Sequence, residues 1–243
     1  MKISLTVDTE IDYKNKNYKK TVDGIKNLLE LDKKYNIKPT LFVTCDCIEK
    51  YPDLFNKLKN KGWEISLHGY RHERFDEMSK EKKEMKIEKA INCFKKYLKI
   101  KPSGLRAPQF SSDFDLIELV EKSGFSYDSS TVQFPLSQLI FFRRKFKLYW
   151  NQMFFKNKIR KNKLKIKEIP VSSFVLPISM FTLRKIPFFM FKILATCSLL
   201  FRKDKTLVFL SHSYEFENKN IEKLEKLIRN YKNIEFTKME DIE

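Results

Sequence analysis

The sequence contains little glycine, little cysteine and very little histidine. Five glycines and 14% aromatic residues in a chain of 243 do not suggest disorder. The four cysteines form no Cys-x-x-Cys pair and have no regular spacing, which favours reduced thiols over a zinc or redox role. Cys45 and Cys47 are expected on the same face of a strand. The composition therefore indicates an ordinary folded protein with free cysteines.

No apolar run in the sequence is long enough to span a bilayer. The longest, residues 186–201, contains Lys192 and falls short of the roughly 18 to 20 residues that a spanning helix needs. It is expected to form a buried or interfacial helix. The apolar run at residues 1–7 ends at Asp8 and is too short for a signal peptide. A cytosolic location is expected, unless another signal has been removed from the chain.

Acidic residues are missing from one long stretch, and the chain as a whole carries a net charge of +18. The basic-aromatic segment, residues 143–167, contains eleven Lys or Arg and no acid, interleaved with five aromatic rings. It belongs to an insertion expected at about 132–167. Such a mixture can bind nucleic acid, can lie on an anionic membrane surface, or can be a solvated basic insertion.

The apolar pattern alternates between strand and helix along the chain. A length of 243 residues with 42% hydrophobic content fits one domain, residues 1–243. Strands are predicted at 3–7, 39–43, 63–67, 104–105, 125–127, 166–171, 205–210 and 234–236. Helices are predicted at 22–35, with Thr21 as the cap, and at 51–61, 79–98, 113–123, 187–201 and 220–231. This alternation indicates an α/β fold of parallel strands with crossover helices, whose chemistry collects at the carboxyl ends of the strands.

All three histidines follow predicted strands. His68 and His72 are four positions apart after the third strand, and His212 follows the strand at 205–210. Taken alone, two histidines at this spacing would often occur on a surface by chance, without binding a metal. A lone His212 after an apolar strand would more often be a core histidine. Asp8 and Glu10 follow the first strand in the same way. The joint placement of every histidine and the first acidic pair predicts a site at one end of the sheet.

These residue types together favour one kind of chemistry. A carboxylate with two histidines can bind a divalent cation and leave open positions for water and substrate, as a catalytic zinc or iron site requires. A bound metal lowers the pKa of its water and polarises a carbonyl oxygen. A second carboxylate can take the proton from that water, and a separate histidine can protonate the leaving group. Metal, base and acid together suit hydrolysis of an amide or an ester.

Five short motifs occur in a fixed order between about residue 3 and residue 216. They are Thr6-Val7-Asp8-Thr9-Glu10, His68-Gly69-Tyr70-Arg71-His72, Arg106-Ala107-Pro108-Gln109-Phe110-Ser111, Tyr127-Asp128-Ser129-Ser130 and Leu210-Ser211-His212-Ser213-Tyr214-Glu215. The order of these motifs and the residues in them resemble the motifs of the polysaccharide deacetylase family, the NodB-homology group of carbohydrate esterases. The resemblance implies a distorted (β/α)7 barrel, similar to a TIM barrel. It also implies removal of N-acetyl, or sometimes O-acetyl, groups from sugars.

The resemblance also assigns roles to the polar residues. Glu10, His68 and His72 are implied to hold a divalent metal, with zinc as the expected ion. Asp8 is implied to be the base that activates water, and His212 the acid that protonates the departing amine.

The loop that follows the fourth strand carries further implied roles. Arg106 is implied to orient the base through a charge-assisted hydrogen bond. A backbone N–H after Pro108 is implied to stabilise the oxyanion, and Pro108, Gln109 and Phe110 are expected to line the substrate groove. Asp128 is expected either to tune His212 or to cap a turn.

The sequence departs from the commonest family pattern at the first motif. Most members have two adjacent aspartates there, whereas Thr9 separates Asp8 from Glu10 in this chain. A subgroup of the family shows the same Asp-x-Glu form with Arg-Ala-Pro-x-Phe-Ser and Tyr-Asp-Ser-Ser, and the chain resembles that subgroup. The longer Glu10 side chain is expected to bind metal in a different geometry or through water.

Three hypotheses follow for function. The first is a cytosolic metal-dependent deacetylase for an N-acetylated saccharide, which the basic-aromatic segment suggests is lipid-linked or polyanionic and presented at the inner membrane face. The second keeps the site but hydrolyses the C–N bond of another amide or a cyclic ureide, as an allantoinase does. The third is a barrel without catalysis that binds nucleic acid or an anionic glycan. Salt-sensitive DNA binding without metal-dependent turnover would favour the third.

Overall fold

The computed structural model describes residues 1–12, 17–134, 164–231 and 233–243. Residues 135–163 lie outside the described residues, so most of the insertion expected at about 132–167 cannot be compared with the prediction. The same holds for the basic-aromatic segment except for its last residues, 164–167.

In the described part of the chain, eight parallel strands form one curved sheet. They are β1 (Lys2–Thr9), β2 (Thr40–Val43), β3 (Glu64–Leu67), β4 (Gly104–Leu105), β5 (Tyr127–Asp128), β6 (Lys167–Glu168), β7 (Thr206–His212) and β8 (Glu235–Phe236). The order across the sheet is β6-β5-β4-β3-β2-β1-β7, and β8 pairs with the first residues of β1. Every one of these pairings is parallel. The predicted alternation of parallel strands and crossover helices is therefore confirmed.

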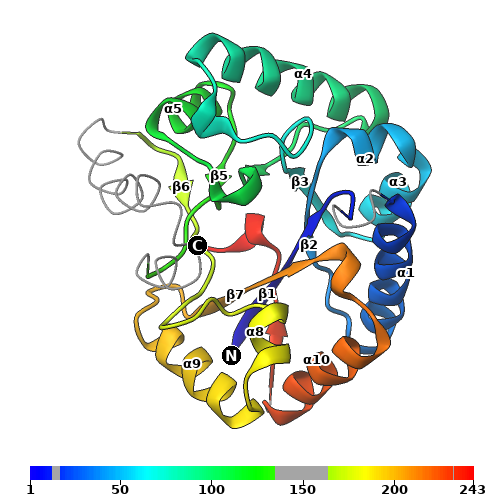
Figure 1. Ribbon diagram of the computed structural model, residues 1–243, viewed down its shortest axis with the longest axis vertical. Coiled ribbons are helices and arrows are strands. Elements are labelled where there is room, and N and C mark those ends of the chain that lie inside the picture. The colour runs from blue at the N-terminus through cyan, green and yellow to red at the C-terminus, as the bar shows by residue number, and fades with distance from the viewer. Residues whose placement is uncertain (13–16, 135–163, 232) are drawn as a thin grey trace.

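Helices surround the sheet on its outer side (Figure 1). The longer ones are α1 (Tyr18–Tyr35), α2 (Cys45–Lys50), α3 (Pro52–Asn60), α4 (Lys80–Leu98), α5 (Phe114–Lys122), α8 (Met180–Lys185), α9 (Phe188–Leu200) and α10 (Asn218–Asn230). Four short 3-10 turns are η1 (Phe75–Glu77), η2 (Pro108–Phe110), η3 (Ser213–Glu215) and η4 (Met239–Asp241). Within the described ranges, no helix combines the length and apolarity needed to cross a membrane.

The two ends of the sheet, β6 and β7, are joined through the segment between them. Ser172 N donates a hydrogen bond to Val208 O at 3.0 Å, and Leu210 N donates to Ile178 O at 3.0 Å. The sheet thus curls into the distorted (β/α)7 barrel that the sequence predicted. A small apolar cluster that includes Phe42 and Val208 forms separately from the larger cluster between the sheet and its helices.

The register of the strands brings the predicted site residues to one end of the barrel. Asp8 on β1 pairs with His212 on β7. Leu67 on β3 pairs with Leu105 on β4, so His68 and Arg106 lie side by side one residue later. Because parallel strands end at the same edge, residues up to 204 positions apart share one layer.

Some local predictions are wrong. Cys45 and Cys47 lie in α2 and not in a strand, because the chain turns into a helix directly after β2. Both cysteines are free and buried. Thr21 does not cap α1, which begins three residues earlier, at Tyr18, after Asn17. The Thr21 hydroxyl donates instead to Glu10 O at 2.5 Å, so this threonine ties the helix to the loop after β1.

Candidate active site

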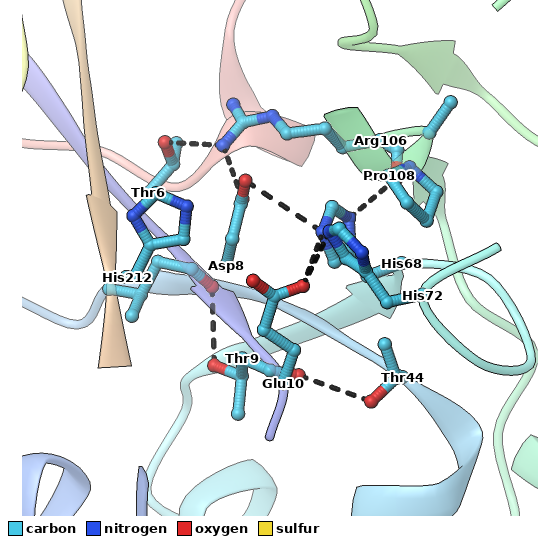
Figure 2. Close-up of polar contacts among 12 residues, drawn as sticks. Thr6, Asp8, Thr9, Glu10, Thr44, His68, His72, Arg106, Pro108 and His212 are labelled. Atoms are coloured by element: carbon cyan, nitrogen blue, oxygen red, sulfur yellow. Dashed lines mark hydrogen bonds and ion pairs between the residues drawn. The ribbon is translucent and has the colours of Figure 1, made fainter. Parts of the chain in front are cut away.

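Glu10, His68 and His72 form a compact group at the carboxyl end of the barrel (Figure 2). Glu10 Oε2 lies 2.8 Å from His72 Nε2 and 3.5 Å from His68 Nε2. One ligand atom from each residue lies within 4.8 Å of the others. Glu10 and His68 are buried, and His72 is partly exposed. The sequence-predicted metal residues are therefore brought together, and His72 is the most exposed of the three.

The loop after β3 fixes the orientation of both histidines. His68 Nδ1 is 2.7 Å from Arg106 O, and since a carbonyl can only accept, this nitrogen carries a proton and Nε2 is the ring nitrogen that faces Glu10. Gly69 has φ +87°, and a Cβ there would lie 2.9 Å from Arg71 O. Only glycine is comfortable at this position, so the short spacer between the two histidines depends on it.

The charge distribution of this group suits a cation. Burial alone would raise the pKa of Glu10, but His68 and His72 outweigh it and lower the pKa to about 2. Burial opposes protonation of His68, yet Asp8 and Glu10 raise its pKa. The same two carboxylates that favour a proton on this ring favour a metal ion beside it.

The hydrogen bonding of Glu10 also suits a bound cation. Among the described residues, Glu10 Oε2 is one of the few buried side-chain oxygens without an aligned hydrogen-bond donor, although two ring nitrogens are close to it. Ligand atoms of a tetrahedral zinc site lie roughly 3.3 Å apart, which is close to the two separations from Glu10 Oε2. A carboxylate and two imidazoles at these distances fit a divalent cation.

Asp8 is held by a fully buried arginine. Arg106 Nη1 donates to Asp8 Oδ1 at 2.8 Å and to Thr6 Oγ1 at 2.9 Å, as Figure 2 shows. Arg106 Nη2 donates to Ser129 Oγ at 2.9 Å, and the guanidinium lies over the Phe42 ring at 4.1 Å. Asp8 Oδ2 faces His68 Nε2 at 3.9 Å. One carboxylate oxygen is thus fixed by Arg106 while the other faces the candidate metal group.

His212 lies on the other side of Asp8 from His68 and His72 (Figure 2). Its Nδ1 is 3.2 Å from Glu215 Oε2, and the same oxygen accepts the His212 backbone N–H at 2.9 Å. The ring also stacks on Tyr214. Burial would lower the pKa of His212, but Glu215, with smaller contributions from Asp8 and Glu10, raises it to about 9. The imidazole is therefore protonated at neutral pH and can act as an acid.

Asp128 contacts its own turn. Its carboxylate accepts hydrogen bonds from Ser130 N at 2.9 Å and Ser130 Oγ at 2.7 Å. These contacts cap a turn, which was one of the two roles expected for Asp128. Burial raises the pKa of Asp128 to about 6. The carboxylate that contacts the His212 ring belongs to Glu215. Ser130 Oγ also accepts the Ala107 N–H at 2.8 Å, so Asp128 supports the Arg106 loop.

The loop after β4 has an unusual backbone. Gln109 and Phe110 both have positive φ, 55° and 56°, a conformation that costs energy for residues with side chains. The loop is held by Ser111 Oγ, which donates to Pro108 O at 2.7 Å. Pro108 is buried, Phe110 is partly exposed and Gln109 is exposed. The turn thus presents the Gln109 side chain to solvent beside the candidate site.

Sequence reasoning missed three residues that support the site: Thr6, Ser129 and Glu215. Thr6 and Ser129 complete the hydrogen bonds of Arg106. Glu215 closes the fifth motif and lies three residues after His212, one turn of a short 3-10 helix. That spacing was a readable signal, because residues three apart in such a turn lie on one face.

The fold and the site define a class: α/β barrels that carry a carboxylate–histidine group at the carboxyl ends of their strands. Comparison with known families identifies the family within that class. The polysaccharide deacetylase model matches residues 2–127, which include four of the five motifs in whole or in part. The chain belongs to the polysaccharide deacetylase family.

Two curated relatives agree with this family. The chain is 32% identical to a peptidoglycan deacetylase-like protein of Gibberella zeae over 109 residues, 44% of this chain and 32% of that protein. It is 33% identical to the peptidoglycan deacetylase of Helicobacter pylori over 107 residues, 44% of this chain and 36% of that protein. The chain thus matches about a third of the length of these relatives.

A solved structure shows the same fold over nearly the whole chain. The crystal structure of a protein of Mycobacterium smegmatis described as a polysaccharide deacetylase superposes with a TM-score of 0.68 and 16% identity. The superposition covers 98% of this chain and 87% of that one. The similarity extends past residue 127, where the family model ends, and includes the strand that carries His212.

Proposed function

We propose that the protein is a metal-dependent deacetylase that hydrolyses an N-acetyl group on a saccharide. The observation that carries the proposal is the convergence of two carboxylates on one histidine. Asp8 Oδ2 and Glu10 Oε2 lie 3.9 and 3.5 Å from His68 Nε2. Because Arg106 fixes the other oxygen of Asp8, this side chain can serve as base beside the group formed by Glu10 and the histidines.

Glu10, His68 and His72 would hold the divalent cation, with zinc expected from the two imidazoles and one carboxylate. The chemistry that such a cation supplies when bound is polarisation of the acetyl carbonyl and acidification of water. A water oxygen attacks the carbonyl carbon while Asp8 accepts one water proton. The Gln109 backbone N–H, in the loop after Pro108, is the proposed donor to the oxyanion.

His212 completes the reaction on the opposite side of Asp8. As the C–N bond breaks, the imidazolium donates its proton to the amine nitrogen, so that acetate and a free amino sugar leave. The pKa of about 9 keeps this ring protonated at neutral pH. Asp8, paired with Arg106, and His212, protonated and paired with Glu215, have opposite roles because their neighbours carry opposite charges.

The location of the substrate is part of the same proposal. The high positive charge of the basic-aromatic segment, residues 143–167, supports a lipid-linked or polyanionic saccharide at the inner membrane face, with the protein in the cytoplasm. Only residues 164–167 of this segment belong to the described part of the chain. Nucleic acid is not proposed as a partner, because a binding role alone does not account for base, acid and candidate ligands together.

Acetate release from a panel of substrates tests the proposal. The purified protein, loaded with zinc, would be offered free, nucleotide-linked and lipid-linked N-acetyl sugars, O-acetylated xylan and a cyclic ureide. We expect turnover of an N-acetyl sugar. A chelator should abolish this turnover, and added metal should restore it. Hydrolysis of the ureide alone would replace the proposal with the second hypothesis, and DNA binding without any turnover would replace it with the third.

A further inference from the structure

Helix α9 has an apolar outer surface. Phe189, Ile193 and Leu200 are 65%, 57% and 68% exposed, and their spacing places them on one face of the helix. A helix on the outside of a barrel ordinarily turns polar residues to water. Phe191 and Ala195, on the opposite face, are fully buried against the barrel. The helix is therefore apolar on both sides, and its outer side is uncovered among the residues that the structure describes.

The exposed apolar residues concentrate at this helix and its neighbours. Of the large hydrophobic side chains that are exposed in the described ranges, all but Met85 on α4 lie between residues 175 and 201. We call the group on and next to the helix the α9 face; it comprises Phe189, Met190, Ile193, Leu200 and Phe201. A shallow hollow in this face is lined by Phe189, Ile193 and Cys197 together with Thr196 and Lys192. Scattered exposed residues need no explanation, but such a cluster marks an interaction surface.

The segment that carries the α9 face has only positive charges, and lysines of α10 lie next to it. Residues 169–203 contain five Lys or Arg and no acid. Lys226, from the neighbouring α10, lies over the Phe188 ring at 4.9 Å, and Lys223 Nζ donates to Arg184 O at 3.0 Å. An apolar helix face bordered by lysines matches the surface of helices that lie in the headgroup region of anionic membranes.

We propose that the α9 face docks the barrel on an anionic lipid bilayer. The helix has 13 residues, roughly 20 Å of length, which is too short to span the hydrocarbon core and suits a helix that lies in the plane of the surface. The absence of acids from residues 169–203 favours anionic lipid over a basic or mixed protein partner. None of its residues belongs to the basic-aromatic segment, residues 143–167, and the proposal does not depend on the catalytic role.

Docking by this face would place the membrane near the site. Arg184 of α8 is 3.9 Å from Glu215, the partner of His212, and α8 leads directly into α9 (Figure 1). The rim of the site on the His212 side would therefore lie close to the lipid headgroups.

Flotation with lipid vesicles tests the proposal. The full chain would be mixed with vesicles of equal parts phosphatidylglycerol and phosphatidylcholine, and with vesicles of phosphatidylcholine alone. The triple variant Phe189→Ser, Ile193→Ser, Leu200→Ser removes three exposed side chains, while Phe201 stays because it stacks on Phe174. The matched control is Met85→Ser, which removes an exposed apolar side chain on another face. Circular dichroism melts check that each variant folds.

We expect the wild type and Met85→Ser to float with the anionic vesicles and not with the neutral ones. The triple variant should bind at least about tenfold less, because three apolar side chains no longer enter the lipid. Wild-type binding by the triple variant would overturn the proposal in favour of another surface. No vesicle binding by the wild type, together with a dimer that the triple variant abolishes in size-exclusion chromatography, would assign the face to a second copy of the chain.

Discussion

The pairing of Glu215 with His212 gives the sharpest prediction, through the variant Glu215→Gln. The pKa of His212 is raised from 6.5 to about 9, with Glu215 as the largest favourable contribution. Glutamine removes the negative charge but keeps an oxygen that can accept the His212 backbone N–H, a contact of 2.9 Å. The turn should therefore keep its shape, while the imidazolium loses its main partner. The pKa of His212 should fall.

The size of the fall follows from the contact. A hydrogen bond to a charged group is worth about 1.5–3 kcal/mol, equivalent to about one to two pKa units. Because the His212 side chain is 33% exposed, solvent screens the pair, and we expect a fall of about one unit. The carboxylates of Asp8 and Glu10 remain, so the pKa should stay above the ordinary value.

Two measurements report this change. Imidazole NMR follows the titration directly, since the chain has only three histidines. The pH dependence of kcat/KM for acetate release should lose its basic limb about one unit earlier, because the acid form of His212 is lost at lower pH. Glu217→Gln is the control, since Glu217 is an exposed carboxylate near Lys20. An unchanged basic limb and NMR titration in Glu215→Gln would refute the assignment of Glu215 as the tuning residue.

Further predictions concern the base, the candidate ligands and the packing around them. Asp8→Asn should lower turnover by about 10²–10⁴-fold and keep bound metal, whereas His68→Ala should lose metal as well; elemental analysis separates the two. Arg106→Met leaves the buried Asp8 unpaired and should cost about 3–5 kcal/mol in urea unfolding, and a smaller loss would mean that water replaces the guanidinium. Gly24→Ala, which would ordinarily stabilise a helix by ~1 kcal/mol, should destabilise this protein and slow turnover, because the added Cβ would lie 1.8 Å from Ser213 O in the turn after His212.

The fold and the residues of the site could be predicted from the sequence because their signals are local. Strands β1, β3 and β7 are short runs with alternating or consecutive apolar residues, and Asp8, His68 and His212 come at or directly after their ends, so the parallel arrangement gathers these three residues without further information. Dependence on local patterns also explains why Cys45 and Cys47 were wrongly predicted to lie in a strand. The residue pattern continues past the end of β2 without a signal that the chain turns into a helix at Cys45.

The contacts that orient the site could not be predicted in the same way. The bond from His68 Nδ1 to Arg106 O joins positions 38 residues apart, and the bond from Arg106 to Thr6 joins positions 100 apart. Their existence depends on the strand register, which hydrophobic patterns do not fix across a sheet of short strands. Thr21 illustrates the limit: its place near a helix start suggested a cap, but the fold brings it to Glu10 O.

The departure at the first motif has a structural consequence. Successive side chains of a strand point to opposite faces, and residues two apart point to the same face. Thr9 therefore lets Asp8 and Glu10 both turn toward His68, although β1 ends between them. The longer Glu10 side chain reaches Nε2 of both histidines, while the shorter Asp8 stops 3.9 Å from His68 and pairs with Arg106. In the proposed mechanism, the Asp-x-Glu spacing would thus separate the roles of base and ligand by side-chain length. Exchanging the two, as Asp8→Glu with Glu10→Asp, should abolish metal retention even though the composition is unchanged.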